Sequence, residues 1–318
     1  MPVTHHTIVL AISLSAFCFQ AFGEASPTLP SQESPSGITH SFLAFGAETY
    51  LMGADGKVAW TYPRNTRDGF LLRNGNVLMA VTRSKEYPSG AAVEITRDGK
   101  VVFEIAGTQS EVNTVQAVGD GRYMLVEAGD KPRILEVDRA GKILVEVPIQ
   151  AQTKDHHLQS RMTRKLANGN YLVPQLLDKV VREYSPDGKI VWEAKTPAEP
   201  KESWPFTAVR LDDGNTLINC THGNHVIEVD QQGKIVWQLT NADLPGPLLK
   251  DPCGVQRLPN GNTVITSYAQ GSPGEIKLLE VTREKKVVWS YRDAKSHGIH
   301  EFQILDTNGK PLEGRLLK

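Results

Sequence analysis

An Asn-Gly or Asp-Gly pair recurs six times along the chain at intervals of 45 to 48 residues, and this repeat limits the possible folds more than any other feature. The pairs are Asn74-Gly75, Asp120-Gly121, Asn168-Gly169, Asp213-Gly214, Asn260-Gly261 and Asn308-Gly309. Such pairs accept positive φ at both central positions of a type I′ turn, so each predicts a tight β-hairpin. Alternating apolar residues flank the pairs, as expected for strands that bury one face.

A second turn signal alternates with the first. It consists of a glycine, a lysine, two mostly apolar residues and an aromatic residue, with a glutamate five residues before the glycine in most copies. The copies start at Gly56, Gly99, Gly188 and Gly233, with degenerate copies at Gly141 and Lys285. Twelve hairpins therefore alternate along the chain, and each unit of about 45 residues should contain four short strands.

Four-stranded units at this period are typical of the blades of a β-propeller, where each sheet packs face to face on its neighbours. The first unit, which includes Ser41 to Phe45 and the Gly56 hairpin, lacks its first hairpin, and the last unit stops soon after Asn308-Gly309. We therefore predict an all-β, six-bladed propeller of four-stranded antiparallel blades over residues 38–318, forming a single domain. Pairing of the N- and C-terminal strands should close the ring, and either terminus could supply the second strand of the closing blade.

The run Glu-Val-Asp-x-x-Gly-Lys-x-Val-Trp at Glu228 to Trp237 is echoed at 183–192 and at 280–289. It resembles the repeat of the PQQ-binding-like β-propeller family, and the chain is identified as a secreted bacterial member of it. The resemblance covers residues 40–318 and implies that the tryptophan packs against the next blade. It makes PQQ a candidate cofactor, although the chain lacks the vicinal cysteines and the eight blades usual in quinoprotein dehydrogenases. Bacterial arylsulfotransferases, with six blades and catalytic histidines in the channel, are also similar to the chain.

The N-terminus carries the features of an export signal. Residues 8–19 form an apolar run of about a dozen residues, which is too short to span a bilayer, and small residues precede a cleavage site after Gly23. We predict a signal peptide at residues 1–23 and a flexible Pro/Ser-rich leader at residues 24–37. The protein is expected to be periplasmic or secreted, with no transmembrane segment.

Composition excludes several functional classes. With 35 Lys+Arg against 36 Asp+Glu, the chain offers no broad cationic surface for nucleic acid. Three cysteines are too few for a disulfide scaffold. The sequence also lacks a Gly-x-Ser-x-Gly elbow, a phosphate-binding glycine loop, a His-Glu-x-x-His motif and a Cys-x-x-Cys motif.

Residues that recur in every blade serve the scaffold, so function is expected where the blades differ. The strand before each Asn-Gly turn should be the innermost, with its N-terminal end at one mouth of the channel. Alignment of these strands places the predicted ligand-binding set at that mouth: Arg67, Glu111, Asn113, Arg161, Trp204, Asp251 and His300. The arginines suit a carboxylate or sulfate and Trp204 a stacking face, while His157 and His300 are candidate catalytic acid–base groups.

Two further interpretations concern the same mouth. Glu111, Asn113 and Asp251 offer oxygen ligands from different blades, so calcium is a second candidate cofactor, as in six-bladed lactonases. Cys220 and Cys253 should end at this mouth on adjacent blades, and they form a disulfide if their Cα atoms lie within about 7 Å.

The leading functional hypothesis is an exported binding module that holds a small polar ligand or an envelope protein at one mouth of the channel. The alternative is a periplasmic enzyme at that mouth, either a quinoprotein-like oxidoreductase or an arylsulfotransferase- or lactonase-like transferase or hydrolase. The sequence does not decide whether the protein is an enzyme, because the fold supports both functions.

Overall fold

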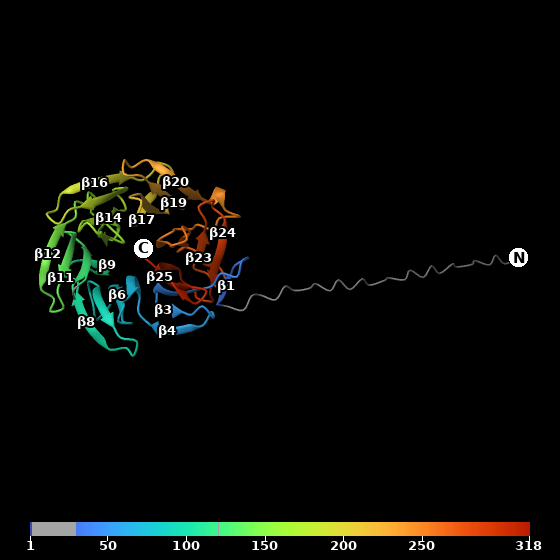
Figure 1. Ribbon diagram of the computed structural model, residues 1–318, viewed down its shortest axis with the longest axis horizontal. Coiled ribbons are helices and arrows are strands. Elements are labelled where there is room, and N and C mark those ends of the chain that lie inside the picture. The colour runs from blue at the N-terminus through green and yellow to red at the C-terminus, as the bar shows by residue number, and fades with distance from the viewer. Residues whose placement is uncertain (2–29, 120) are drawn as a thin grey trace.

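The computed structural model describes Met1, residues 30–119 and residues 121–318. Six antiparallel sheets surround a central channel as the blades of a propeller (Figure 1), which confirms the predicted fold. The predicted signal peptide at residues 1–23 lies outside the described residues, apart from Met1. Within the described part of the chain, no helix is both long and apolar enough to span a membrane.

We number the blades from the one that joins the two ends of the chain. From the channel outwards, blade one contains β25 (Ile299–Thr307), β2 (His40–Gly46), β3 (Thr49–Met52) and β4 (Val58–Tyr62). Blade two contains β5 (Thr66–Leu71), β6 (Val77–Val81), β7 (Ala91–Ile95) and β8 (Val101–Ala106). Blade three contains β9 (Glu111–Ala117), β10 (Tyr123–Ala128), β11 (Arg133–Val137) and β12 (Ile143–Pro148).

The remaining blades follow the same order. Blade four contains β13 (Arg164–Lys165), β14 (Tyr171–Gln175), β15 (Val180–Tyr184) and β16 (Ile190–Lys195). Blade five contains β17 (Ser203–Arg210), β18 (Thr216–His222), β19 (His225–Val229) and β20 (Ile235–Thr240). Blade six contains β21 (Val255–Arg257), β22 (Thr263–Thr266), β23 (Ile276–Val281) and β24 (Val287–Arg292). Two short 3-10 helices, η1 (His156–Leu158) and η2 (Asn241–Asp243), lie in the connections before blades four and six.

The two ends of the chain close the ring in blade one. The C-terminal strand β25 is the inner strand and pairs with the N-terminal strand β2, so the N-terminus supplies the second strand. The short strand β26 (Lys310–Pro311) pairs with the end of β25. Closure by pairing of the terminal strands is therefore confirmed.

The prediction of a flexible leader at residues 24–37 is wrong for part of that range. Ser31–Glu33 form β1, which pairs antiparallel with β24 and adds a fifth strand to the outer edge of blade six. An outer strand carries unpaired main-chain groups, and an extended segment that satisfies them becomes ordered despite its polar composition. Residues 24–29 lie outside the described residues.

The predicted type I′ geometry is found at one of the Asn-Gly turns. Asn308 and Gly309 both have positive φ, at 53° and 73°. At Asn74-Gly75, by contrast, Gly75 alone has positive φ, its N–H bonds to Leu72 O, and the Leu72 N–H bonds to Asn76 O. That pattern is a type I turn followed by a left-handed glycine, the three-residue hairpin loop, so the asparagine does not need a left-handed conformation.

The repeated glutamates join five of the six blades to the next, and blade one has Leu51 at the corresponding position. Glu94 accepts hydrogen bonds from Asn76 of its own blade at 2.6 Å and from Arg139 of blade three at 3.1 Å. Four other glutamates make the same kind of contact with the following blade: Glu136 with Lys165, Glu183 with Arg210, Glu228 with Arg257 and Glu280 with His40. These carboxylates serve the scaffold, as their repetition in the sequence indicates.

The aromatic residues of the outer strands make a second connection between blades. Trp60, Trp192 and Trp237 donate their indole N–H to main-chain carbonyls of the next blade, at 2.8–3.0 Å. Phe103 stacks on Tyr123 of blade three with ring centroids 3.9 Å apart. Trp289, which is fully buried, instead donates to the side chain of Gln32 in β1.

Candidate functional site

A cavity of about 450 Å³ opens at the mouth of the channel where the inner strands begin. The lining includes the candidate acid–base residue His157 and five residues of the predicted ligand-binding set: Arg67, Arg161, Trp204, Asp251 and His300. The alignment of inner strands therefore correctly predicted that residues from blades one, two, four, five and six meet at this mouth. The volume is within the range of small-molecule sites.

Glu111 organises the cationic side of this cavity. Its Oε2 accepts a hydrogen bond from Arg67 Nη2 at 3.0 Å and lies 3.3 Å from His157 Nδ1, while its Oε1 lies 3.6 Å from Arg161 Nη1. Burial opposes ionisation of Glu111, but the hydrogen bond from His157 and the charges of Arg67 and Arg161 outweigh it, so the pKa of Glu111 lies below its usual value. Glu111 is therefore an ionised carboxylate that holds the three basic groups together.

Arg161 is the most deeply buried charge at the mouth. Its side chain is 1% exposed, and Nη1 donates to the Ser160 carbonyl at 2.9 Å. Its Nε has no hydrogen-bond partner among the residues that the structure describes. Burial, together with repulsion from Arg67, lowers the pKa of Arg161 to about 9, so the guanidinium is charged at pH 7 but poorly compensated.

His300, on β25, faces Arg161 and Arg67 from across the ring closure. Burial and these two positive charges hold the pKa of His300 well below its usual value, so the imidazole is neutral at pH 7. Its Nδ1 has no hydrogen-bond partner within the described part of the chain. The Tyr268 ring lies 4.2 Å from the His300 ring, centroid to centroid. The free nitrogen of a neutral imidazole can form a hydrogen bond with a ligand, whereas the burial and the positive charges that lower its pKa disfavour its protonation.

Aromatic side chains form the other side of the cavity. Trp204 and Phe206 come from β17, where the register shifts between Pro205 and Thr207, so that Phe206 is the extra residue of a β-bulge. The Trp204 and His222 rings lie 4.3 Å apart at an angle of 37°. Pro205, which lies between Trp204 and Phe206 in β17, does not line the cavity.

Several residues of the site were missed because they lie on the second strand of a blade. Tyr268 follows β22 and His222 ends β18, and both line the cavity with Thr82 and Leu176, which follow β6 and β14. Antiparallel second strands return to the mouth at which the first strands begin. The turn spacing also marks where the second strands end, so the same alignment extended to the second strand of every blade predicts these residues.

The other predicted residues lie close to the mouth in different roles. Asn113 is fully buried, and its Nδ2 donates to the Ser160 carbonyl at 3.1 Å. Asp251 accepts a hydrogen bond from the His222 main-chain N–H at 2.9 Å. Glu111, Asn113 and Asp251 are thus engaged separately, and Glu111 faces two guanidinium groups that would repel a cation. Among the described residues no three His, Cys, Asp or Glu side chains converge, so the arrangement argues against calcium here.

The disulfide considered between Cys220 and Cys253 is not formed in the structure, where both cysteines are free and buried. Cys220 packs with Leu172 and Val181 of blade four, while Cys253 lines the cavity at the mouth. Successive residues of a strand point to opposite faces, so Cys220 points away from the cavity that its neighbour Thr221 lines.

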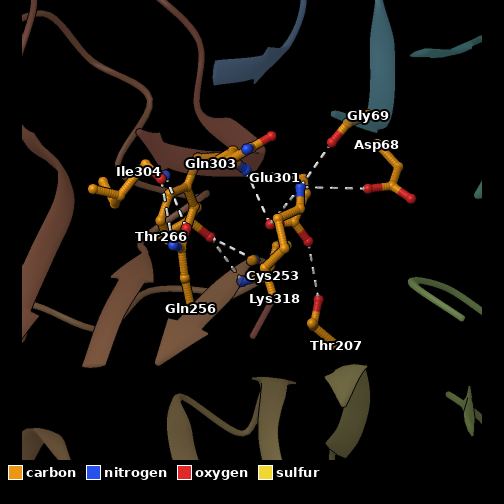
Figure 2. Close-up of polar contacts among 12 residues, drawn as sticks. Asp68, Gly69, Thr207, Cys253, Gln256, Thr266, Glu301, Gln303, Ile304 and Lys318 are labelled. Carbon is orange, nitrogen blue, oxygen red and sulfur yellow. Dashed lines mark hydrogen bonds and ion pairs between the residues drawn. The ribbon is translucent and has the colours of Figure 1, made fainter. Parts of the chain in front are cut away.

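Beneath the mouth, the C-terminus lies at the centre of the ring (Figure 1). Lys318 Nζ donates to the Gly69 carbonyl at 2.8 Å and lies 3.8 Å from Asp68 and 3.9 Å from Glu301 (Figure 2). Asp68 also accepts two hydrogen bonds from Arg164, at 2.8 and 3.0 Å. Asp68 and Glu301 directly follow Arg67 and His300 in the chain, so this buried charge cluster lies close to the cavity without lining it.

A second cavity, of about 430 Å³, lies where the C-terminal segment enters the channel. Three of its basic side chains pair with carboxylates of the scaffold or of nearby loops: Lys165 with Glu136, Arg210 with Glu183 and Arg315 with Asp212. The cavity at the mouth is the stronger candidate site, because there two guanidinium groups share one carboxylate.

Comparisons with known proteins agree with the fold. The model of a family described as "Mal s 1 allergenic protein-like" matches residues 149–249, about a third of the chain. No curated protein matches the chain.

Solved structures match over most of the chain. A protein of unknown function from Bacteroides caccae is 24% identical, with a TM-score of 0.72, and the match covers 87% of this chain and all of that one. A catalytically inactive histidine-to-alanine variant of virginiamycin B lyase from Staphylococcus aureus, with quinupristin, is 14% identical, with a TM-score of 0.59, covering 86% of this chain and 96% of that one. At these identities the likeness shows the propeller fold alone, and membership of the PQQ-binding-like family stays a prediction.

Proposed function

We propose that this chain is a binding module that holds a small anionic ligand in the cavity at the mouth of its channel. The observation that carries the proposal is Arg161, whose guanidinium is buried in the cavity wall and whose Nε has no hydrogen-bond partner among the described residues. Arg67 stands beside it, and Glu111 is the carboxylate that both contact.

Electrostatics favours an anion at this place. A buried charge without a full complement of partners costs several kcal/mol, and an added carboxylate or sulfate would supply both the missing charge and a hydrogen-bond acceptor. The lowered pKa of Arg161 has the same origin, since burial and Arg67 destabilise its charged form. An anion bound at the mouth would therefore relieve a penalty that the free protein carries.

The test is titration calorimetry of the mature protein with acetate, sulfate and citrate. Arg161→Met should weaken binding at least tenfold, because a charge-assisted hydrogen bond contributes about 1.5–3 kcal/mol. Arg73→Met is the matched control, since Arg73 is exposed in the hairpin after β5, at the opposite end of that strand. Equal binding by the two variants, both folded by their melting temperatures, would refute the proposal. Capture of an envelope protein by the wild type but not by Arg161→Met, without binding of any small anion, would favour a protein partner.

A second candidate function is catalysis on a ligand at the same mouth. It is favoured by His300, a neutral imidazole that lies close to two arginines. Its Nδ1 has no hydrogen-bond partner in the part of the chain that the structure describes. Such a group could accept a proton from a ligand whose negative charge the arginines stabilise, as a lyase, hydrolase or transferase requires. The test is the release of 4-nitrophenol from its acetate or sulfate ester. Loss of this release in His300→Gln, in a variant that still binds anions, would support an enzyme. Absorbance beyond the protein band in material from the native host would instead support a quinoprotein-like oxidoreductase.

We also propose that the protein acts outside the cytoplasm. The support is the apolar run at residues 8–19 followed by small residues up to Gly23. The N-terminal sequence of the protein recovered from its host should begin at Glu24, and retention of Met1 would contradict export through this signal.

A further inference from the structure

The cavity at the mouth has two chemically different halves. The basic groups come from blades two and four and the loop between blades three and four: Arg67, His157 and Arg161. The aromatic rings come from blades five, six and one: Trp204, Phe206, Tyr268 and His300. A ligand that spans the cavity therefore meets positive charge on one side of the ring and flat π surfaces on the other.

The aromatic half leaves ring surface accessible. Tyr268 is 36% exposed, a large fraction for a large aromatic side chain beside a cavity. The ring pairs Trp204–His222 and Tyr268–His300 lie at 4.3 and 4.2 Å but are tilted by 37° and 44°. Tilted rings do not cover each other completely, so part of each face stays free to stack on a ligand.

The size of the cavity excludes a bare anion as its best occupant. About 450 Å³ is much more than acetate or sulfate occupies, so either would leave most of the aromatic half in contact with water alone. The planar guanidinium group matches a planar carboxylate, which accepts two parallel hydrogen bonds.

We propose that the ligand is an aromatic carboxylate, with its carboxylate at Arg161 and Arg67 and its ring against Tyr268 and Trp204. This inference rests on the proposed function and adds the chemical class of the ligand. The neutral state of His300 fits it, because a neutral imidazole keeps the ring half uncharged.

The experiment compares four probes by titration calorimetry and saturation-transfer NMR: benzoate, cyclohexanecarboxylate, acetate and benzyl alcohol. Benzoate and cyclohexanecarboxylate have the same charge and carbon skeleton and differ in the π system. Benzoate should bind about fivefold more tightly than cyclohexanecarboxylate, as expected for one added aromatic contact, and more tightly than acetate and benzyl alcohol.

Variants separate the two halves. Tyr268→Leu and Trp204→Leu should each weaken benzoate about fivefold and leave cyclohexanecarboxylate unchanged, whereas Arg161→Met should weaken both carboxylates and leave benzyl alcohol unchanged. Tyr62→Leu is the matched control, since Tyr62 lies on the outer strand β4. Melting temperatures show whether each variant is folded.

Each outcome bears on a different claim. Equal affinity for benzoate and cyclohexanecarboxylate would overturn the aromatic class and leave anion binding intact. Binding of benzyl alcohol but of no carboxylate would overturn anion binding itself. Absence of binding by all four probes at 20 mM, about the weakest affinity that these methods detect, would overturn both.

Discussion

Gln32 should be a main determinant of the stability of the closed ring. Its Oε1 accepts hydrogen bonds from the His40 main-chain N–H at 2.8 Å and from Trp289 Nε1 at 2.9 Å, and its Nε2 donates to the His40 carbonyl at 2.9 Å. One side chain in β1 therefore connects blade six to blade one. In blades one, four and five, the tryptophan reaches a main-chain carbonyl of the next blade without such an intermediary.

Replacing Gln32 by alanine removes these three hydrogen bonds and leaves the buried Trp289 N–H without its partner. A hydrogen bond contributes about 1 kcal/mol net, and an orphaned buried donor costs about 1–3 kcal/mol. We expect Gln32→Ala to lower the free energy of unfolding by about 3 kcal/mol. At about 2–4 °C per kcal/mol for a domain of this size class, the melting temperature should fall by about 6 °C or more.

The measurement is urea unfolding followed by tryptophan fluorescence, with scanning calorimetry for the melting temperature. Gln231→Ala is the matched control, because Trp192 bonds to the main-chain oxygen of Gln231, which the substitution keeps. A double-mutant cycle with Trp289→Phe should give a coupling above about 1 kcal/mol between Gln32 and Trp289. If Gln32→Ala and Gln231→Ala unfold within about 0.5 kcal/mol of each other, the reasoning about ring closure is refuted.

Three further predictions follow from buried groups. Lys318→Met should lower the free energy of unfolding by about 3 kcal/mol, because it leaves two buried carboxylates, Asp68 and Glu301, without one of their counter-charges. Lys310→Met, on the exposed hairpin, should have no effect. Equal stability of the two variants in urea would contradict the role of Lys318 in the buried cluster. Alkylation in denaturant without reductant should label both Cys220 and Cys253, and mass spectrometry that finds them joined would disprove the free thiols. Because the pKa of Glu111 is lowered in the folded state, the ionised carboxylate stabilises the fold above the ordinary pKa of 4.5, and this stabilisation is lost as the pH falls through the lower folded pKa. In Glu111→Gln, the free energy of unfolding should therefore decrease less steeply at acid pH. An unchanged acid dependence would count against the pairing of Glu111 with the basic groups.

The sequence predicted much of the site because turns fix where strands begin. Once the six Asn-Gly or Asp-Gly turns mark the ends of the inner strands, counting back from each turn places Arg67, Arg161 and His300 at one mouth. The count failed where the backbone departs from regular pairing. At the bulge in β17 both Trp204 and Phe206 line the cavity, but the prediction contains only Trp204, because a bulge leaves no mark in the turn spacing.

By itself, the sequence determined the number of blades, the closed ring and the scaffold role of the repeated glutamates and aromatic residues, because each of these depends on short local patterns repeated at a fixed period. The tertiary structure alone decided that β2 supplies the second strand of blade one, that β1 covers β24, and that Cys220 and Cys253 face different clusters. It also decided which groups surround Arg161. These features depend on register and on side-chain contacts between distant segments, such as Gln32 with Trp289, and local periodicity does not specify that register or those contacts.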